Sequence, residues 1–275
     1  MNILIIDRDD LSRELVKSRL EEMGHNVWSD PSKANIDGFL DGNSFDIIFI
    51  DPSPLNNPRQ LILNIRRKIR GQVPYLIFMS ETASYEEALK CGMNDLLMKP
   101  VNPDSLIIKT ENAERLNDLV SRIGDASEDY PSAGGVIAKS AFNQLFLSAL
   151  DRADRYGERS FVLFISISNY KEMYDLDGPY VADSAAAVMA QHLVRLRRQS
   201  DIIAQTGKAE YALMLQRPIY ETEPMDAANR FAEALSEKHD IAANGVKVEI
   251  SVELIDIPVG KRHINHVFDL SEEAT

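Results

Sequence analysis

Four polar side chains within the first hundred residues could together carry out phosphoryl chemistry. Short runs of Ile, Leu, Phe or Met end directly at Asp7, Asp51, Ser80 and Lys99. Two carboxylates can hold a hard divalent cation and supply an oxygen nucleophile, and a hydroxyl and an ammonium can neutralise phosphoryl oxygens. The set therefore suits transfer of a phosphoryl group to a carboxylate, with Asp51 as the nucleophile and Asp7 as a ligand of Mg²⁺.

Buried strands must position these four side chains. The apolar runs at residues 3–6, 47–50, 75–79 and 96–98 are continuous and are separated by helix-like stretches. Continuous apolar runs of this length are typical of a parallel sheet that is buried on both faces. Parallel strands deliver their C-terminal ends to one edge, where open α/β sheets place their ligand sites. We therefore expect the four side chains to meet in one pocket.

Residues 1 to about 120 resemble a two-component receiver domain. The resemblance rests on residues 3–7, 45–51, 79–80, 88–92 and 98–100. It implies a doubly wound, five-stranded parallel sheet in the flavodoxin-like order 2-1-3-4-5. It also implies that Asp51 is the phosphoacceptor, Ser80 the switch hydroxyl and Lys99 the phosphate-binding lysine. The backbone carbonyl of Ser53 would complete the Mg²⁺ shell with Asp7 and Asp51.

Arg8 departs from the receiver pattern, which usually has two adjacent acidic residues after the first strand. A guanidinium there removes a metal ligand and adds a repulsion of ~4 kcal/mol per unit charge at ~4 Å and an effective dielectric of ~20. Asp9 or Asp10 could compensate if the loop bends inward, or Arg8 could point into solvent. Of the functions expected of this site, binding of Mg²⁺ is therefore the one that Arg8 weakens most, and phosphorylation of Asp51 depends on it. Leu96 also stands where receivers often carry an aromatic switch residue.

Composition indicates a cytoplasmic signalling protein. A chain of 275 residues is comfortable for two cores, and its net charge of -13 disfavours nonspecific binding to nucleic acid. The single cysteine, Cys91, excludes an internal disulfide. No apolar stretch approaches the ~18 residues of a membrane span, and the opening apolar run is too short for a signal peptide. The basic run at residues 66–70 is predicted to be the solvated end of a helix.

A linker divides the chain into two domains. Residues 124–135 are rich in Gly, Ser, Asp and Pro and follow a helix predicted from Pro103 past Leu119. We place the receiver at residues 1–120, the linker at 121–136 and a second domain at 137–275. In the second domain we predict helices at 138–156, 181–197 and 224–238, and strands at 160–168, 202–206, 210–215 and 246–257. This succession predicts an α+β fold with a mainly antiparallel sheet.

Residues from about 130 to about 258 resemble the GGDEF domain of diguanylate cyclases. The matching stretches are 150–157, 165–171, 198–204 and 207–215. These enzymes condense two GTP molecules through bound metal ions. By the resemblance, Ser166, Ser168 and Ala209 stand where the family has metal-binding carboxylates, and Lys208 replaces a loop glycine. Tyr174 replaces a guanine-contacting asparagine.

A hydroxyl or a methyl group cannot replace an anionic oxygen ligand of a hard cation. We therefore expect a protein that is not an enzyme, with a degenerate GGDEF domain that acts by protein interaction or dimerisation. Lys171 and Asp183 do match the family. An active, phospho-regulated cyclase with an unusual metal site is the alternative from another class. The resemblance implies a sensor histidine kinase or a phosphotransfer protein as the upstream partner.

Arg198 and Asp201 fit the Arg-x-x-Asp pattern that many GGDEF domains use as an inhibitory site for cyclic di-GMP. An arginine can fork onto a phosphate or a guanine edge, and an aspartate can accept from the guanine amino group. A basic helix end followed by a turn aspartate would give the same pattern without a ligand. Gln205 also replaces an arginine often found just before the loop. A cyclic di-GMP receptor is therefore a further alternative.

Overall fold

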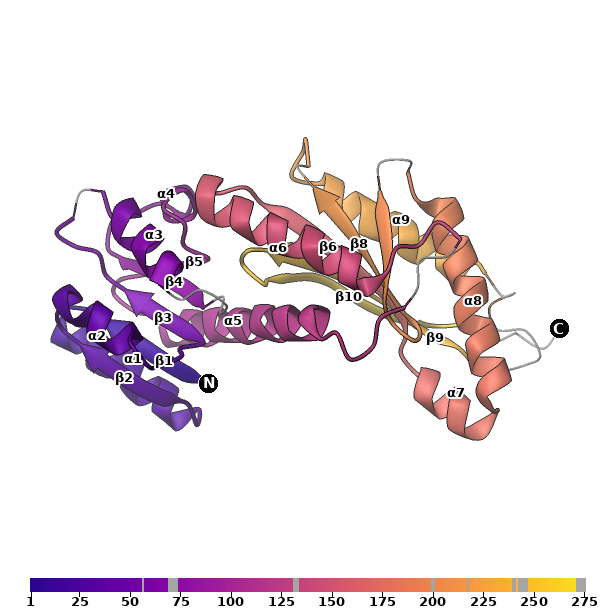
Figure 1. Cartoon of the computed structure of the whole chain (residues 1–275), viewed down its shortest axis with the longest axis horizontal. Coiled ribbons are helices and arrows are strands. Elements are labelled where there is room, and N and C mark those ends of the chain that lie inside the picture. The colour runs from indigo at the N-terminus through magenta and orange to yellow at the C-terminus, as the bar shows by residue number, and fades with distance from the viewer. Residues whose placement is uncertain are drawn as a thin grey trace. The chain divides into compact units, whose positions relative to one another are not determined.

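The computed structural model describes residues 1–55, 57–68, 74–130, 134–198, 201–216, 218–238, 241 and 247–270. The chain forms two compact units (Figure 1). Unit 1 comprises residues 1–121, 150–158 and 258–260, and unit 2 comprises residues 122–149, 159–257 and 261–275. None of the helices in these described stretches combines the length and the apolar character needed to cross a bilayer.

Unit 1 contains a five-stranded sheet in the order β2-β1-β3-β4-β5 with every neighbouring pair parallel. Its strands are β1 (Asn2–Ile6), β2 (Asn26–Asp30), β3 (Ile47–Ile50), β4 (Tyr75–Ser80) and β5 (Asp95–Met98). Ile48 and Ile50 pack in a cluster with residues of α2, α3 and α4, and the intervening Phe49 is also fully buried. The predicted receiver-type order, with both faces of the sheet buried, is confirmed.

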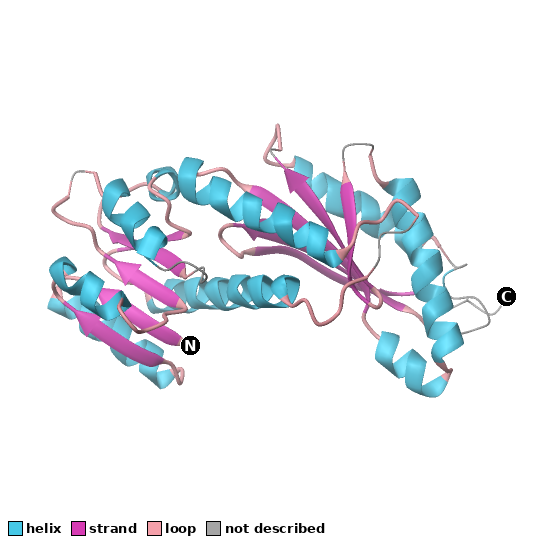
Figure 2. Ribbon diagram, in the orientation of Figure 1, coloured by secondary structure: helices cyan, strands magenta, loops and turns pink. Residues whose placement is uncertain are grey.

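The helices of unit 1 connect these strands (Figure 2). They are α1 (Asp10–Glu22), the short 3₁₀ helix η1 (Lys33–Asn35), α2 (Ile36–Leu40), α3 (Arg59–Lys68), α4 (Tyr85–Lys90) and α5 (Pro103–Gly124). Helix α4 begins with a capping box, in which Ser84 and Glu87 bond each other's backbone N–H groups. Helix α5 runs to Gly124 because its buried positions Leu116, Leu119 and Ile123 keep a helical period. The predicted linker at 121–136 therefore starts inside the helix.

Arg66, at the end of α3, is buried, and the prediction of a solvated basic end is wrong for this residue. Its guanidinium donates to the carbonyl of Pro74 at 2.7 Å and to Oδ1 of Asn94 at 2.6 Å. A planar group with five donors satisfies several loop oxygens at once, which offsets the cost of its burial. Residues 69 and 70 of the basic run lie outside the described residues.

Unit 2 contains a five-stranded antiparallel sheet in the order β10-β9-β6-β8-β7. Its strands are β6 (Ser160–Ile167), β7 (Ile202–Gly207), β8 (Glu210–Gln216), β9 (Glu249–Ile257) and β10 (Arg262–Asp269). Helices α6 (Lys139–Tyr156), α7 (Tyr170–Leu176), α8 (Pro179–Leu196) and α9 (Glu223–Ser236) accompany them, although residues 150–156 of α6 belong to unit 1. Met189 of α8 and Phe231 of α9 pack with sheet residues such as Leu213 and Leu254 in one core. The expected α+β architecture is confirmed.

Two elements of unit 2 were not predicted from the sequence. Helix α7 has only seven residues, which is too short for a clear apolar period. Strand β10 is an edge strand that pairs only with β9 and has mostly exposed or half-buried residues. Charged and polar side chains on an edge strand hide the alternation that identifies a strand in the sequence.

Candidate functional site

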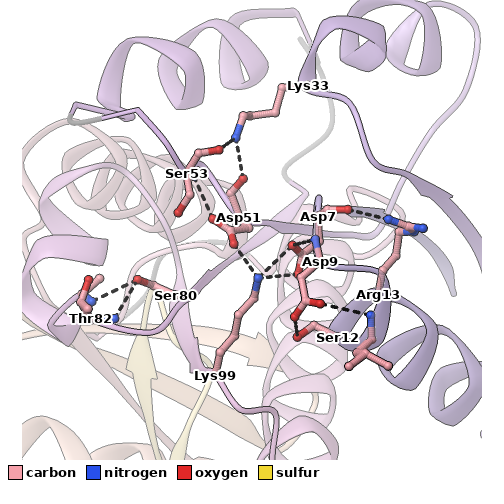
Figure 3. A network of polar contacts seen from close by, with 12 residues as sticks. Asp7, Asp9, Ser12, Arg13, Lys33, Asp51, Ser53, Ser80, Thr82 and Lys99 are labelled. Atoms are coloured by element: carbon pink, nitrogen blue, oxygen red, sulfur yellow. Dashed lines mark hydrogen bonds and ion pairs between the residues drawn. The ribbon is translucent and has the colours of Figure 1, made fainter.

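The C-terminal ends of β1, β3 and β5 bring Asp7, Asp51 and Lys99 together in one pocket (Figure 3). The backbone N–H of Asp51 donates to the carbonyl of Ile6 at 2.9 Å, which continues the β1–β3 pairing up to the site. The backbone N–H of Lys99 donates to the carbonyl of Ser80 at 2.8 Å, which continues the β4–β5 pairing up to the site. The convergence expected from three apolar runs is therefore present in the fold.

The Lys99 ammonium lies between the two carboxylates. Its Nζ is 2.8 Å from Asp7 Oδ1 and 2.7 Å from Asp7 Oδ2, and it is 2.5 Å from Asp51 Oδ2. The side chains of Lys99 and Asp7 are 5% and 0% exposed, and that of Asp51 is 14% exposed. Such charge-assisted bonds are short and strong because the site is largely closed to water.

Asp51 and Lys99 hold each other in the charged state. Burial raises the pKa of Asp51, but hydrogen bonds from Lys99 and Ser53 outweigh it, so the pKa lies below its usual value. Burial lowers the pKa of Lys99, but bonds to Asp51 and Asp7 outweigh it, so that pKa lies above its usual value. The Asp51 carboxyl group is therefore ionised at neutral pH.

Ser80 lies at the end of β4 beside these groups, but its hydroxyl faces the following loop. Its Oγ accepts hydrogen bonds from the backbone N–H groups of Thr82 at 3.2 Å and Ala83 at 3.1 Å (Figure 3). A serine at the end of a strand often satisfies the next backbone donors in this way. The structure therefore places Ser80 at the site without joining its hydroxyl to Asp51 or Lys99.

Neither of the acidic residues that could have compensated for Arg8 does so. Asp9 is the N-cap of α1, since its Oδ1 accepts from the N–H of Leu11 at 3.1 Å and its Oδ2 from the Ser12 hydroxyl at 2.5 Å. The bond from Ser12 is the main reason that the pKa of Asp9 lies below its usual value. Asp10 is exposed and pairs with Arg13. Both carboxylates are therefore engaged by α1, that of Asp9 as its N-cap and that of Asp10 in the pair with Arg13.

Arg8 itself is exposed to solvent. The sequence analysis allowed that Arg8 could point into solvent, and the structure has it in that position. The loop after β1 thus offers the pocket one carboxylate, that of Asp7.

Lys33, in η1, belongs to the site although the sequence analysis did not single it out. Its Nζ donates to the backbone carbonyl of Asp51 at 3.0 Å and to that of Ser53 (Figure 3). Burial lowers the pKa of Lys33, and the nearby Asp51 carboxylate acts in the opposite direction. A lysine at the start of a three-residue helix between β2 and α2 carries no spacing signal that could have marked it.

Ser166, Ser168 and Ala209 meet at one end of β6 in unit 2, as the GGDEF resemblance implies. Ser166 pairs with Glu210 in the β6–β8 register, and the N–H of Ile167 donates to the carbonyl of Ala209 at 3.0 Å. The Ser168 hydroxyl donates to the carbonyl of Glu249 at 3.2 Å. These three side chains bring only hydroxyl and methyl groups to this place.

Glu210 and Glu249, which contact this place through β8 and β9, have cationic partners. Glu210 accepts from Arg122 at 2.5 Å and from the Thr206 hydroxyl at 2.6 Å. Glu249 pairs with Lys247 at 2.9 Å. Across the described stretches of the chain, no three His, Cys, Asp or Glu residues gather as a metal-binding group.

Arg198 and Asp201 lie together at a cavity of about 300 Å³. The backbone N–H of Arg198 donates to Asp201 Oδ2 at 2.9 Å, and its guanidinium donates to Glu223 Oε1 at 3.2 Å. Arg230 of α9 also lines the cavity, and its buried Nε makes no hydrogen bond. The residues that the sequence paired are therefore neighbours, with a second arginine beside them.

Comparison with protein families decides what these two parts are. The response regulator receiver domain matches residues 3–111, and the diguanylate cyclase GGDEF domain matches residues 131–275. The chain belongs to the GGDEF domain family and carries a receiver domain.

Individual relatives match one part of the chain each. The alginate biosynthesis transcriptional regulatory protein AlgB of Pseudomonas aeruginosa is 26% identical over 154 residues, covering 50% of this chain and 34% of that protein. Protein PetR of Rhodobacter capsulatus is 28% identical over 126 residues, covering 46% of this chain and 51% of that protein. The chain thus spans between about a third and a half of the length of these relatives.

Two solved structures are each similar to part of this chain. A two-component response regulator from Clostridium difficile is 26% identical with a TM-score of 0.38, covering 42% of this chain and 96% of that one. The GGDEF domain of PA1120 from Pseudomonas aeruginosa is 21% identical with a TM-score of 0.35, covering 43% of this chain and 70% of that one.

Proposed function

We propose that this protein is a response regulator that is phosphorylated on Asp51 and passes its signal on by contact. The observation that carries the proposal is the Lys99 ammonium held between the carboxyl groups of Asp7 and Asp51. In this proposal the GGDEF domain binds a downstream protein or a second copy of the chain and does not synthesise cyclic di-GMP.

Asp51 is the nucleophile of the proposed transfer. One of its carboxylate oxygens forms a bond to phosphorus as the bond between phosphorus and the donor's histidine nitrogen breaks. Lys99 moves its hydrogen bond from Asp51 to a phosphoryl oxygen and neutralises the added charge. The Ser80 hydroxyl donates to another phosphoryl oxygen when it leaves the N–H groups of Thr82 and Ala83. That exchange couples phosphorylation to the β4–α4 loop and shifts the receiver between two populations.

Receiver domains generally bind Mg²⁺ at the phosphorylation site. In this chain its ligands would be Asp7, Asp51 and the backbone carbonyl of Ser53. As arranged, these donors do not fit the ion, because Lys99 bonds both carboxylates and Lys33 bonds the Ser53 carbonyl. The transfer proposed above therefore relies on the two lysines and the serine alone.

The proposal that the GGDEF domain is inactive is supported by its neutral side chains. Metal-assisted condensation of GTP needs anionic oxygens that hold the cations against the triphosphate. Ser166, Ser168 and Ala209 supply none, and Glu210 and Glu249 are engaged with Arg122 and Lys247. A domain of this kind can still present a folded surface to a partner.

Phosphorylation is tested by incubation of the wild type, Asp51→Asn and Asp46→Asn with acetyl phosphate, followed by intact mass. We expect the wild type and Asp46→Asn to gain one phosphoryl group and Asp51→Asn to gain none, because Asp46 lies just before the other end of β3. In parallel, incubation with GTP and Mg²⁺ or Mn²⁺ is expected to give no cyclic di-GMP. An unmodified wild type would overturn the first half of the proposal, and a robust cyclic product the second.

Binding of cyclic di-GMP is the second candidate function, and the cavity with Arg198, Asp201 and Arg230 favours it. A bond from arginine to a charged group contributes about 1.5–3 kcal/mol, so Arg198→Ala is expected to weaken binding at least about tenfold. Titration calorimetry measures this. Arg195→Ala is the matched control, because Arg195 is exposed near the end of α8, three residues before Arg198, and is not among the residues that line the cavity. Absence of binding heat in the wild type would remove this candidate.

A further inference from the structure

Lys33 is held in place at the phosphorylation site by the loop that follows β2. Asp30, the last residue of β2, accepts a hydrogen bond from the N–H of Ser32 at 2.5 Å, and Ser32 caps η1 by accepting from the N–H of Ala34. These bonds position the first residue of η1, and its side chain reaches across to the loop after β3 (Figure 3). The position of Lys33 therefore depends on the end of β2 and on the cap of η1, so Lys33 is not an isolated surface side chain.

The ammonium of Lys33 lies where a hard cation would find its oxygen ligands. It bonds the carbonyl of Asp51 at 3.0 Å and the carbonyl of Ser53, the residue whose carbonyl was expected to complete a metal shell. Carbonyl oxygens are ligands that hard cations use, and they are also acceptors that an ammonium with three donors can satisfy. An ammonium and a divalent ion that bind the same carbonyl oxygens lie close together and repel each other, so each opposes binding of the other.

The carboxylates of the pocket already have enough positive charge around them without a divalent ion. Two carboxylates, Asp7 and Asp51, face two ammonium groups, Lys33 and Lys99. Arg8 adds a third positive charge in the loop after β1, where it opposes any incoming cation. An added divalent ion would leave the pocket with an excess of positive charge.

We propose that Lys33 is a built-in cation of this receiver, which occupies the carbonyl oxygens of Asp51 and Ser53 and thereby excludes Mg²⁺ from the phosphorylation site. The proposal takes the location of the site from the proposed function and adds how its charge is regulated. Lys33 is then a positioning residue. It holds the loop after β3, which carries Asp51, by donating to the backbone carbonyl oxygens of that loop.

The test uses Mn²⁺ as the probe and measures free Mn²⁺ by electron paramagnetic resonance in solutions of the full chain. We expect the wild type to bind Mn²⁺ weakly and Lys33→Ala to bind one ion at least about tenfold more tightly, because the repulsion and the competing donor are gone. Lys33→Gln, which keeps a polar side chain that is one atom shorter and uncharged, is expected to follow Lys33→Ala. Adding Asp51→Asn to Lys33→Ala is expected to remove the gain.

Lys68→Ala is the matched control for the loss of one positive charge from the same unit. Lys68 pairs with Asp37 at 2.8 Å at the surface, so its removal is expected to leave the affinity for Mn²⁺ unchanged. The inference is overturned if the wild type binds Mn²⁺ as tightly as Lys33→Ala does, or if neither Lys33 variant gains affinity. Because Mn²⁺ binding is measured without a phosphoryl donor, failure of Asp51 to become phosphorylated would count against the proposed function and not against this inference.

Discussion

Replacement of Lys99 by methionine is expected to lower the free energy of unfolding by about 3–5 kcal/mol, the cost typical of breaking a buried ion pair from one side. Asp7 and Asp51 would then face each other without the ammonium that bonds both. Lys33 cannot take over this role where it stands, because it bonds backbone carbonyls and not the carboxylate oxygens. Urea unfolding of the wild type and the variant near neutral pH measures the difference.

The pH dependence of this loss has a definite sign. In the wild type the pKa of Asp51 is lowered from 3.8, so its contribution to stability is present above that value and is lost as pH falls through the lowered pKa. The pKa of Lys99 is raised from 10.5, so its contribution is present below that value and is lost as pH rises through the raised pKa. In Lys99→Met two carboxylates repel each other, which raises their pKa values, so the deficit is expected to shrink as pH falls from neutral towards about 4.

Two further variants distinguish the pocket from a general effect of charge. Lys90→Met removes an ammonium that is 65% exposed and pairs with Glu86 on α4, and it is expected to change stability by less than about 0.5 kcal/mol. Adding Asp7→Asn to Lys99→Met is expected to recover part of the loss, because one of the two facing charges is gone. A loss below about 1 kcal/mol for Lys99→Met, a value typical of exposed pairs, would contradict the buried arrangement.

The sheet of unit 1 could be predicted because its strands are marked by composition alone. Continuous runs such as 47–50 and 75–79 are buried on both faces, so they need no alternation to be recognised. Once the strands are parallel, the side chains that follow them must share one edge. This is why the sequence alone could place Asp7, Asp51 and Lys99 in one pocket.

The hydrogen-bond partners within the pocket could not be predicted in the same way. Asp9 and Ser80 each have a backbone donor two residues ahead, and these local bonds compete with the pocket for the side chain. Lys33 lies in the short helix η1, whose sequence has no recognisable pattern, and its long side chain reaches the site from there. Sequence spacing fixes where a residue is attached, but local competition decides where its polar atoms go.

The outcome in unit 2 shows the same distinction. Placement of Ser166, Ser168 and Ala209 at one point followed from the family resemblance, and the register of β6 and β8 brings them there. The engagement of Glu210 with Arg122 did not follow, because Arg122 lies on α5, in a region where the sequence indicated a linker. The partners of the surrounding carboxylates, which support the proposed loss of metal binding, required the structure.

Replacement of Phe231 by alanine is expected to destabilise the GGDEF domain by about 3–5 kcal/mol, the usual cost of truncating a buried phenylalanine. Phe231 lies on α9, is 0% exposed, and belongs to the core cluster that contains Leu254 of β9 and Leu235 of its own helix. Since the surrounding strands are paired on both sides along β9, they can close only part of the space that the ring leaves. Urea unfolding followed by circular dichroism measures the effect.

The controls for this variant lie at the same position and on the same helix. Phe231→Leu keeps most of the apolar volume and is expected to cost less than about half as much, because the cavity is smaller. Glu233→Ala removes an exposed side chain of α9 and is expected to change stability by less than about 0.5 kcal/mol. Equal losses for Phe231→Ala and Phe231→Leu would mean that the ring does not fill this core. If the domain acts by contact, its contribution to signalling is a stable surface, and Phe231 is one of the residues that maintain it without touching the Asp51 site.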